Sequence, residues 1–289
     1  MQLKNSIYLT GIHRSGTSWI GKMLSFGGEF ILKDEEIFNL AHNNCVTQDS
    51  PINRWFLQIN EDKEHKYLDY IERILTDRYS LHKALSHSRD IFLVGKAVFF
   101  KNRSLMRRLF GSKHPRIIIE PIGLLSTDWF YNKFNPSVIV TIRHPASFVS
   151  SLKRLNWKFD FCNLIDQKHL MTGRLQRFQE ELGNSKALTD DIIGQGILLW
   201  RLLYSVVKEY QEQYPNWIYI RHEDLAAEPI GGFRRLYKQL GLDFTPLSEA
   251  RILKYSGDSN PPEPPENKAE RIRRRSRDTI RIWEQRLEK

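Results

Sequence analysis

A strand, a glycine-bounded loop and a helix follow one another between Ile7 and Leu24. The first four residues are mostly apolar and favour a strand, Gly11 and Gly16 bound the loop, and apolar residues then recur at helical spacing. The glycines let the loop turn its backbone N–H groups inward, and the helix adds its positive dipole end. The sequence therefore predicts an α/β chain whose first loop binds phosphate or sulfate.

The cation of this loop stands at an unusual place. The Gly-x4-Gly spacing is that of nucleotide-binding loops, in which Lys and then Ser or Thr follow the second glycine. Here Thr17 and Ser18 follow it, and Arg14 lies inside the loop. A simple tight turn would account for the glycines alone. The cation and the paired hydroxyls favour a loop for a differently arranged anhydride.

Composition limits the number of domains and the compartment. A chain of 289 residues with 40% hydrophobic residues can bury one large core, so we expect a single domain over residues 1–289. Cys45 and Cys162 form no paired motif, which agrees with a reducing compartment and predicts no metal site. We find no apolar run typical of a signal peptide or a membrane span, and expect a cytoplasmic protein.

The net charge of +10 is concentrated at the end of the chain, where residues 267–289 carry nine Lys or Arg against four acids. Such a basic helix can be a solvated face, a contact for nucleic acid or lipid, or one wall of a site for a small polyanion. Composition leaves these alternatives open.

The rest of the chain predicts further elements of an α/β fold. We expect a helical insertion at about 45–90, an irregular, lid-like segment at about 156–190 and a basic helix at about 267–289. A long amphipathic helix is predicted over Gly196–Tyr210. Beside the first strand and the one discussed below, the predicted strands are Glu29–Leu32, Ile91–Val94, Arg116–Ile119 and Trp217–Ile220.

Two adjacent carboxylates follow the second predicted strand. Open α/β sheets place ligands at the carboxyl ends of strands, so Glu35 or Glu36 could act as a general base there. An acidic helix start, favoured by the helix dipole, is the alternative explanation.

A second anion-binding pattern lies in the middle of the chain. The uncharged β-branched run Val138–Ile142 predicts a buried central parallel strand, and it stops at Arg143. Ser151 follows in the next predicted helix. Arg143 and this hydroxyl could close on a single phosphate. Alternatively, Arg143 could simply pair with an acid. Together with the first loop, the pattern favours a ligand with two anionic ends.

Four segments together resemble sulfotransferases that use 3′-phosphoadenosine 5′-phosphosulfate (PAPS), above all the bacterial branch related to carbohydrate sulfotransferases. Residues 11–24 resemble the family's 5′-phosphosulfate loop, and residues 138–152 its 3′-phosphate motif. Residues 219–242 resemble its Tyr-Glu-Asp-Leu segment, and residues 274–283 its late basic motif. The resemblance implies a three-layer P-loop-type fold with a central parallel sheet, flanking helices and helical insertions.

The resemblance also implies roles for individual residues. The 5′-phosphosulfate would be held by Arg14, Ser15, Gly16, Thr17 and Ser18, and the 3′-phosphate by Arg143, Ser151 and Arg274 or Ser276. Arg14 would stabilise the leaving oxygen of adenosine 3′,5′-bisphosphate (PAP) without a metal ion. The acceptor would be a hydroxyl, with a saccharide as the first choice; a lipid, a phenol or another alcohol stays open, as does the oligomeric state.

The segment EIFN at 36–39 resembles a Glu-Pro-Phe-Asn signature of this branch, which favours Glu36 as the base. His13, His42 and His144 are the other candidates for the base. The chain departs from the family where Ile119-Glu120-Pro121 replaces Lys-Asp-Pro; a cation near the sulfate is missing there, and Lys96 is a candidate replacement. Trp157 is the candidate for stacking on adenine.

Two other functions are weighed against this one. A P-loop kinase would need the missing lysine and a strand that ends in a metal-binding Asp. A polyanion-binding protein without enzymatic activity could use the basic end of the chain, but we find no nucleic-acid-binding signature and expect no nucleic-acid partner.

Overall fold

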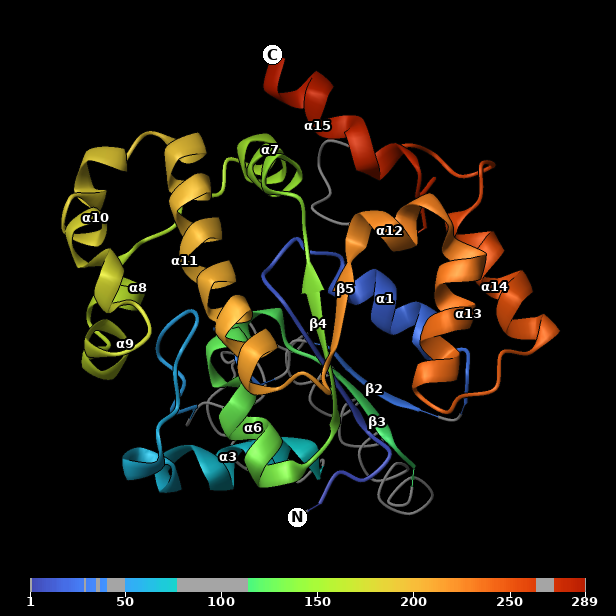
Figure 1. The fold of residues 1–289 in the computed structure, drawn as a ribbon, viewed down its shortest axis with the longest axis horizontal. Coiled ribbons are helices and arrows are strands. Elements are labelled where there is room, and N and C mark those ends of the chain that lie inside the picture. Colours follow the sequence, from blue (N-terminus) through green and yellow to red (C-terminus); the bar gives the residue numbers. More distant parts are fainter. Residues whose placement is uncertain are drawn as a thin grey trace, which may run out of the picture.

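Five parallel strands form the centre of the protein (Figure 1). The structure is a computed structural model that describes residues 2–28, 30–34, 37–40, 50–76, 114–263 and 273–288. The strands are β1 (Ile7–Thr10), β2 (Ile31–Asp34), β3 (Arg116–Ile119), β4 (Ser137–Ile142) and β5 (Ile218–Arg221). Their order in the sheet is β2-β3-β1-β4-β5, so β1 lies in the middle.

The two faces of the sheet pack against different sets of helices. On β1, Tyr8 belongs to one core cluster, whereas Ile7 and Leu9 belong to the other, as the two-residue period of a strand requires. Helices α1 (Thr17–Leu24), α13 (Pro229–Gln239) and α14 (Pro246–Ser256) cover the second face (Figure 1). The buried apolar residues on both sides of each central strand explain why β4 reads as a continuous β-branched run.

The first face carries the larger core. It packs against α3 (His65–Leu75), α6 (Thr127–Phe134) and the long helix α11 (Ile192–Gln213). Local signals set the ends of these helices: the Asp191 side chain accepts from the Gly194 N–H at the start of α11, and Asn135 ends α6 in the left-handed conformation.

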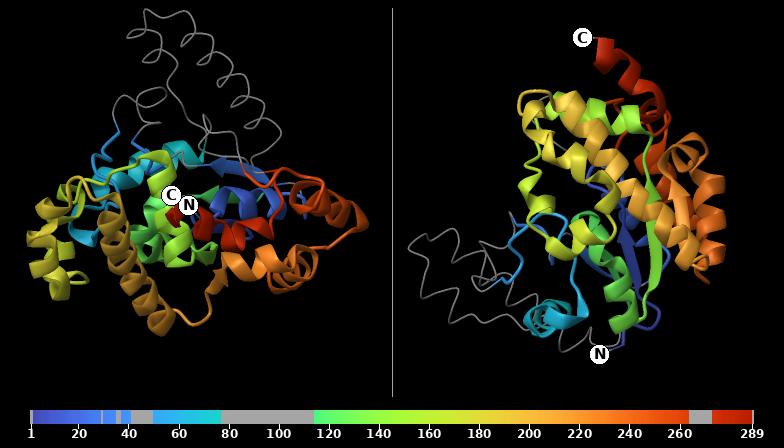
Figure 2. Two further views of the ribbon diagram at one scale, coloured as in Figure 1. Left: turned by 90° about the horizontal axis from the view of Figure 1, so that it is seen from above. Right: turned by 60° about the vertical axis from the view of Figure 1, so that its left-hand side comes forward.

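Shorter elements complete the chain. They are the α-helices α7 (Pro145–Leu155), α8 (Cys162–Ile165), α9 (Lys168–Thr172), α10 (Gln179–Gly183), α12 (His222–Ala227) and α15 (Asp278–Glu288), and the 3-10 helices η1 (Glu61–Lys63), η2 (Pro121–Ser126), η3 (Gln176–Phe178) and η4 (Ser185–Leu188). In both Figures 1 and 2, α15 lies over the edge of the sheet at which the strands end, next to α7.

The predicted α/β fold with a central parallel sheet and flanking helices is confirmed. The strand predicted over Trp217–Ile220 is found one residue later, as β5, whereas the strand predicted over Ile91–Val94 lies outside the described residues. The segment 156–190 was expected to be irregular, but it contains three short α-helices and two 3-10 helices. Its apolar residues, among them Leu164, Leu170 and Leu182, anchor these turns in the first core.

Candidate functional site

The first loop lies where β1 ends, at the carboxyl edge of the sheet. Gly16 caps α1 with φ +92°, and Arg14 is also left-handed, with φ +64°. Thr141 Oγ donates to the Thr10 carbonyl at 3.0 Å, so the hydroxyl of Ser15 must donate to Thr141 Oγ at 2.6 Å. The loop is therefore fixed to β4 through Ser15, whose hydroxyl was predicted to hold the ligand. That the backbone N–H groups at the start of α1 bind an anion stays a prediction.

The structure brings Arg14 of this loop to Ser151 of α7, as the two anion patterns required. Arg14 Nε donates to Ser151 Oγ at 2.9 Å. The guanidinium carbon of Arg14 also lies 5.6 Å from the centre of the Trp157 ring, within the range of cation–π contacts. Residues 137 positions apart thus join the two predicted halves of the site.

Arg143 is buried directly after β4 and is held by three elements. Its backbone N–H donates to the Tyr204 hydroxyl of α11 at 2.8 Å, and its Nη2 donates to the Thr279 carbonyl of α15 at 3.1 Å. Its Nε lies 3.2 Å from Glu223 Oε1 of α12. Trp200 Nε1 donates to the Arg143 carbonyl at 2.9 Å. Arg143 therefore does pair with an acid, the alternative that its sequence position left open, and it is rigidly oriented.

Over the part of the chain that the structure describes, several guanidinium groups lie close enough to Arg143 to act on one another. Burial lowers its pKa to about 10, and burial followed by the charges of Arg143 and Arg286 lowers the pKa of Arg274 to about 9. Arg14 contributes to both shifts. Among the described residues, Glu223 is the carboxylate that acts on Arg143, and Glu263 acts on Arg274. This cluster of Arg14, Arg143, Arg274 and Arg286, the arginine cluster, carries two more charges than these two carboxylates balance.

His222 connects the loop to the arginine cluster. A Cβ added to Gly16 would lie 2.3 Å from His222 Nδ1, so the imidazole packs directly against the loop glycine. His222 Nε2 lies 3.2 Å from Thr279 Oγ, and this hydroxyl already donates to the Ser276 carbonyl at 2.7 Å. Nε2 must therefore carry the proton, and Nδ1 is an acceptor. Burial, followed by the charges of Arg143 and Arg274, lowers the pKa of His222 well below its usual value, which keeps the ring neutral.

The late basic segment packs against the same edge. Ser276 Oγ donates to the Ala226 carbonyl of α12 at 2.9 Å, so this predicted ligand residue fixes the segment in place. Trp283 stacks on His144 with ring centres 5.4 Å apart. Over the residues that are described, the basic end of the chain therefore packs beside Arg143 and His144, and its role in binding an anion stays a prediction.

Glu120 fixes the chain after β2. Its carboxylate accepts from the backbone N–H groups of Ile37 at 2.8 Å and Phe38 at 3.2 Å, and it is fully buried. This explains why an acid at this position fits the fold. The candidate bases Glu36, Glu35 and His42 and the candidate cation Lys96 lie outside the described residues, and the role predicted for each stays a prediction.

Three buried polar atoms could contact an anion with several oxygens. Ser147 Oγ, His144 Nδ1 and His222 Nδ1 are each buried without a hydrogen-bond partner among the described residues. Sequence reasoning missed Tyr204, Glu223 and Thr279. The signal for Glu223 was present, because His222-Glu223 directly follows a strand at the carboxyl edge.

A family model described as a sulfotransferase domain matches residues 4–286. The chain belongs to the sulfotransferase domain family. Membership supports the transfer of a sulfuryl group as its activity. No curated protein matches the chain.

Solved structures of sulfotransferases are similar at low identity. The sulfotransferase domain from the curacin biosynthetic pathway is 15% identical, covering 89% of this chain and 80% of its own, with a TM-score of 0.45. Sulfotransferase STF9 from Mycobacterium avium is 13% identical, covering 87% and 67%, with a TM-score of 0.41. Sulfotransferase STF1 from Mycobacterium tuberculosis H37Rv is 13% identical, covering 88% and 72%, with a TM-score of 0.40.

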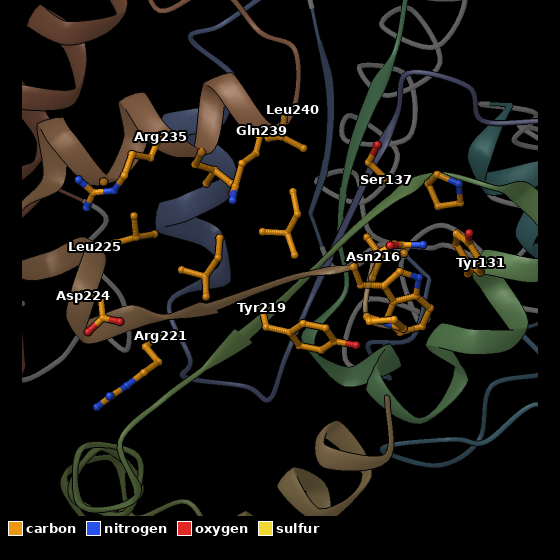
Figure 3. A pocket seen from close by; sticks show the side chains of 18 of the residues that line it. Tyr131, Ser137, Asn216, Tyr219, Arg221, Asp224, Leu225, Arg235, Gln239 and Leu240 are labelled. Atoms are coloured by element: carbon orange, nitrogen blue, oxygen red, sulfur yellow. The ribbon is translucent and has the colours of Figure 1, made fainter. Parts of the chain in front are cut away.

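A separate cavity of about 860 Å³ follows β5, the last strand of the sheet (Figure 3). Four of the residues that line it are Tyr219 and Arg221 of β5, Tyr131 of α6 and Arg235 of α13, and no residue of the arginine cluster lines it.

The described residues hold no group of three or more His, Cys, Asp or Glu that could bind a metal ion. None of their helices combines the length and apolar character needed to span a membrane.

Proposed function

We propose that this sulfotransferase-family chain transfers a sulfuryl group from PAPS to an acceptor hydroxyl, with a saccharide or glycoconjugate as the acceptor. The observation that carries the choice of donor is the arginine cluster at the end of β1 and β4. It joins two anion-binding segments through the bond from Arg14 to Ser151, so it suits a ligand with two anionic groups close together. PAPS carries such groups at its 3′ and 5′ positions.

In this proposal each end of the donor meets a different part of the cluster. The backbone N–H groups of Gly16, Thr17 and Ser18, with Arg14, bind the 5′-phosphosulfate at the N-terminus of α1. Arg143 and Arg274 bind the 3′-phosphate together with Ser151. Each bond to an ionised phosphate is charge-assisted and stronger than a neutral one.

Sulfuryl transfer asks the protein mainly to position the reactants and to stabilise charge. The acceptor oxygen attacks sulfur in line with the leaving oxygen, and Arg14 stabilises the negative charge that develops on that oxygen. A base must remove the acceptor proton. Glu36 is the candidate that the sequence favours, and Glu120 holds the backbone of Ile37 directly after it.

Thermal-shift titration with PAP tests the choice of donor. A ligand that binds only the folded protein adds about 2.7 kcal/mol of stability at a hundredfold excess over its dissociation constant. We expect a shift with PAP that is larger than with ATP and magnesium. In Lys133→Ala, whose side chain pairs with Glu64 away from the cluster, the shift should persist. A shift with ATP and magnesium but none with PAP would overturn the proposal.

A further inference from the structure

His13 lies in a pocket of aromatic rings next to the reacting end of the proposed donor site. Its ring centre is 5.2 Å from Phe148, 5.7 Å from Phe56 and 6.4 Å from Trp157. It directly precedes Arg14, whose guanidinium packs on the same Trp157 ring. The imidazole and the guanidinium therefore both lie next to the Trp157 ring.

The imidazole has a nitrogen that can take up a proton. Nδ1 is buried and has no hydrogen-bond partner among the described residues. Burial, followed by the charge of Arg14, lowers the pKa of His13 to about 3, so the ring is neutral at pH 7. The rings of Phe56, Phe148 and Trp157 that pack against it carry no charge.

An anionic donor would change this balance. Phosphate and sulfate groups bound by Arg14 oppose its positive charge, which favours the protonated form of a neighbouring imidazole. Burial, the larger cause of the low pKa of His13, would remain, but the opposing charge would raise this pKa from about 3. A pKa closer to the working pH makes a better general base. The same ring that is neutral without the donor would become a stronger base when the donor is bound.

Trp157, the candidate for stacking on adenine, contacts Arg14 at the phosphosulfate end of the proposed donor site, so its ring is better placed to offer a surface on which an acceptor can lie. It is 42% exposed, although its ring contacts both Arg14 and His13. A flat indole face is suited to the apolar face of a sugar ring, and it loses little conformational entropy on binding. A sugar that packs there would bring its hydroxyls close to His13 and Arg14.

We propose that Trp157 forms the acceptor site for a saccharide ring and that His13 is the catalytic base that removes the proton from its hydroxyl. This inference rests on the proposed function. The acceptor O–H bond breaks and its proton goes to an imidazole nitrogen, while the acceptor oxygen forms a bond to sulfur. The bond between sulfur and the bridging oxygen breaks, and its electron pair stays on PAP next to Arg14.

Hydrolysis of PAPS tests the base without a known acceptor, because water then supplies the hydroxyl. Removing a general base typically costs about 10²–10⁴-fold in rate, so we expect His13→Gln to slow sulfate release at least about a hundredfold. The dissociation constant for PAP should change less than about threefold. Glu36→Gln is the matched comparison: a loss confined to Glu36→Gln would overturn the role of His13. Equal losses of PAP binding and of rate in His13→Gln would also overturn it.

Two further measurements address the mechanism. In NMR spectra of ring-labelled histidine, saturating PAP should raise the pKa of His13 by at least about two units, and an unchanged pKa would contradict the inference. With a panel of methyl glycosides, Trp157→Ala should lower sugar sulfation at least about tenfold, and the loss should appear in the KM for the glycoside more than in the dissociation constant for PAP. Transfer to 4-nitrophenol but to no glycoside would overturn the assignment of a saccharide. A wild-type protein that binds no PAP would instead overturn the proposed function itself.

Discussion

Replacing Gly16 with alanine should damage the donor site through two separable effects. At φ +92° an alanine is strained by about 1–2 kcal/mol. Its Cβ would also lie 2.3 Å from His222 Nδ1, and forcing atoms into a packed site typically costs about 1–3 kcal/mol. The imidazole cannot swing away cheaply, because it lies between the loop, the Trp19 ring at 5.3 Å and Thr279. We therefore expect a total destabilisation of about 2–5 kcal/mol.

Gly241 provides the control for the strain alone. It also has a positive φ, +66°, but nothing lies within 4 Å of an added Cβ. Gly241→Ala should therefore lower the free energy of unfolding only by the backbone strain at positive φ. We expect its melting temperature to fall by about 2–4 °C, against about 4–10 °C for Gly16→Ala. PAP affinity should fall at least about tenfold in Gly16→Ala and stay unchanged in Gly241→Ala.

The double substitution Gly16→Ala/His222→Ala isolates the steric part. Removing the imidazole gives the added methyl group room, so the double variant should be at least about 1 kcal/mol more stable than the sum of the single effects predicts. The assay is chemical denaturation of all four proteins together with PAP titration. Additive effects of the two substitutions on stability, or equal losses of stability in Gly16→Ala and Gly241→Ala, would refute the close packing of His222 on the loop.

Three further predictions concern the arginine cluster. Arg143→Ala should abolish PAP binding and leave Glu223 buried and unpaired, at a cost of about 3–5 kcal/mol; adding Glu223→Gln should restore stability but not binding, as denaturation and titration would show. Ser151→Ala removes the acceptor for Arg14 Nε and should weaken PAP binding about five- to tenfold by calorimetry, whereas an unchanged affinity would remove Ser151 from the site. The unfolded state binds a proton near pH 6.5 that folded His222 does not, so stability should fall below that pH. His222→Gln should reduce this slope by about 1.4 kcal/mol per pH unit in denaturation at pH 5 to 6.5, and an unchanged slope would contradict a neutral His222.

Local patterns explain why much of the fold, including the strand, loop and helix around Arg14, could be predicted from the sequence. The β-branched run before Arg143 and the glycine spacing around Arg14 are each contained within a few residues, and both lie at the carboxyl edge as expected. The partners of Arg143 could not be predicted in this way. Tyr204 is 61 positions away and Thr279 is 136 positions away, and only the packing of α11 and α15 brings them together.

Hydroxyl groups were the least predictable part of the site. A serine in a phosphate loop and a serine in a basic motif both suggest ligand contacts, yet Ser15 and Ser276 are buried and donate within the protein. A hydroxyl has one proton to donate, so each internal bond of this kind removes a donor from the ligand. The sequence cannot distinguish a hydroxyl that supports a loop from one that faces a ligand, because both uses favour the same residue.

The way in which Arg143 is held links the donor site to the end of the chain. Its guanidinium is oriented by Glu223 of α12 and by the Thr279 carbonyl of α15, and the Thr279 hydroxyl in turn contacts His222 below the loop. A displacement of α15 would therefore remove a partner from Arg143 and from His222 at the same time. In the proposed function PAP binds to Arg143 in its oriented form, so bound PAP should also stabilise the packing of α15 on α12. Hydrogen exchange in α15 should accordingly slow when PAP binds, whereas exchange in the distant helix α6 should not change.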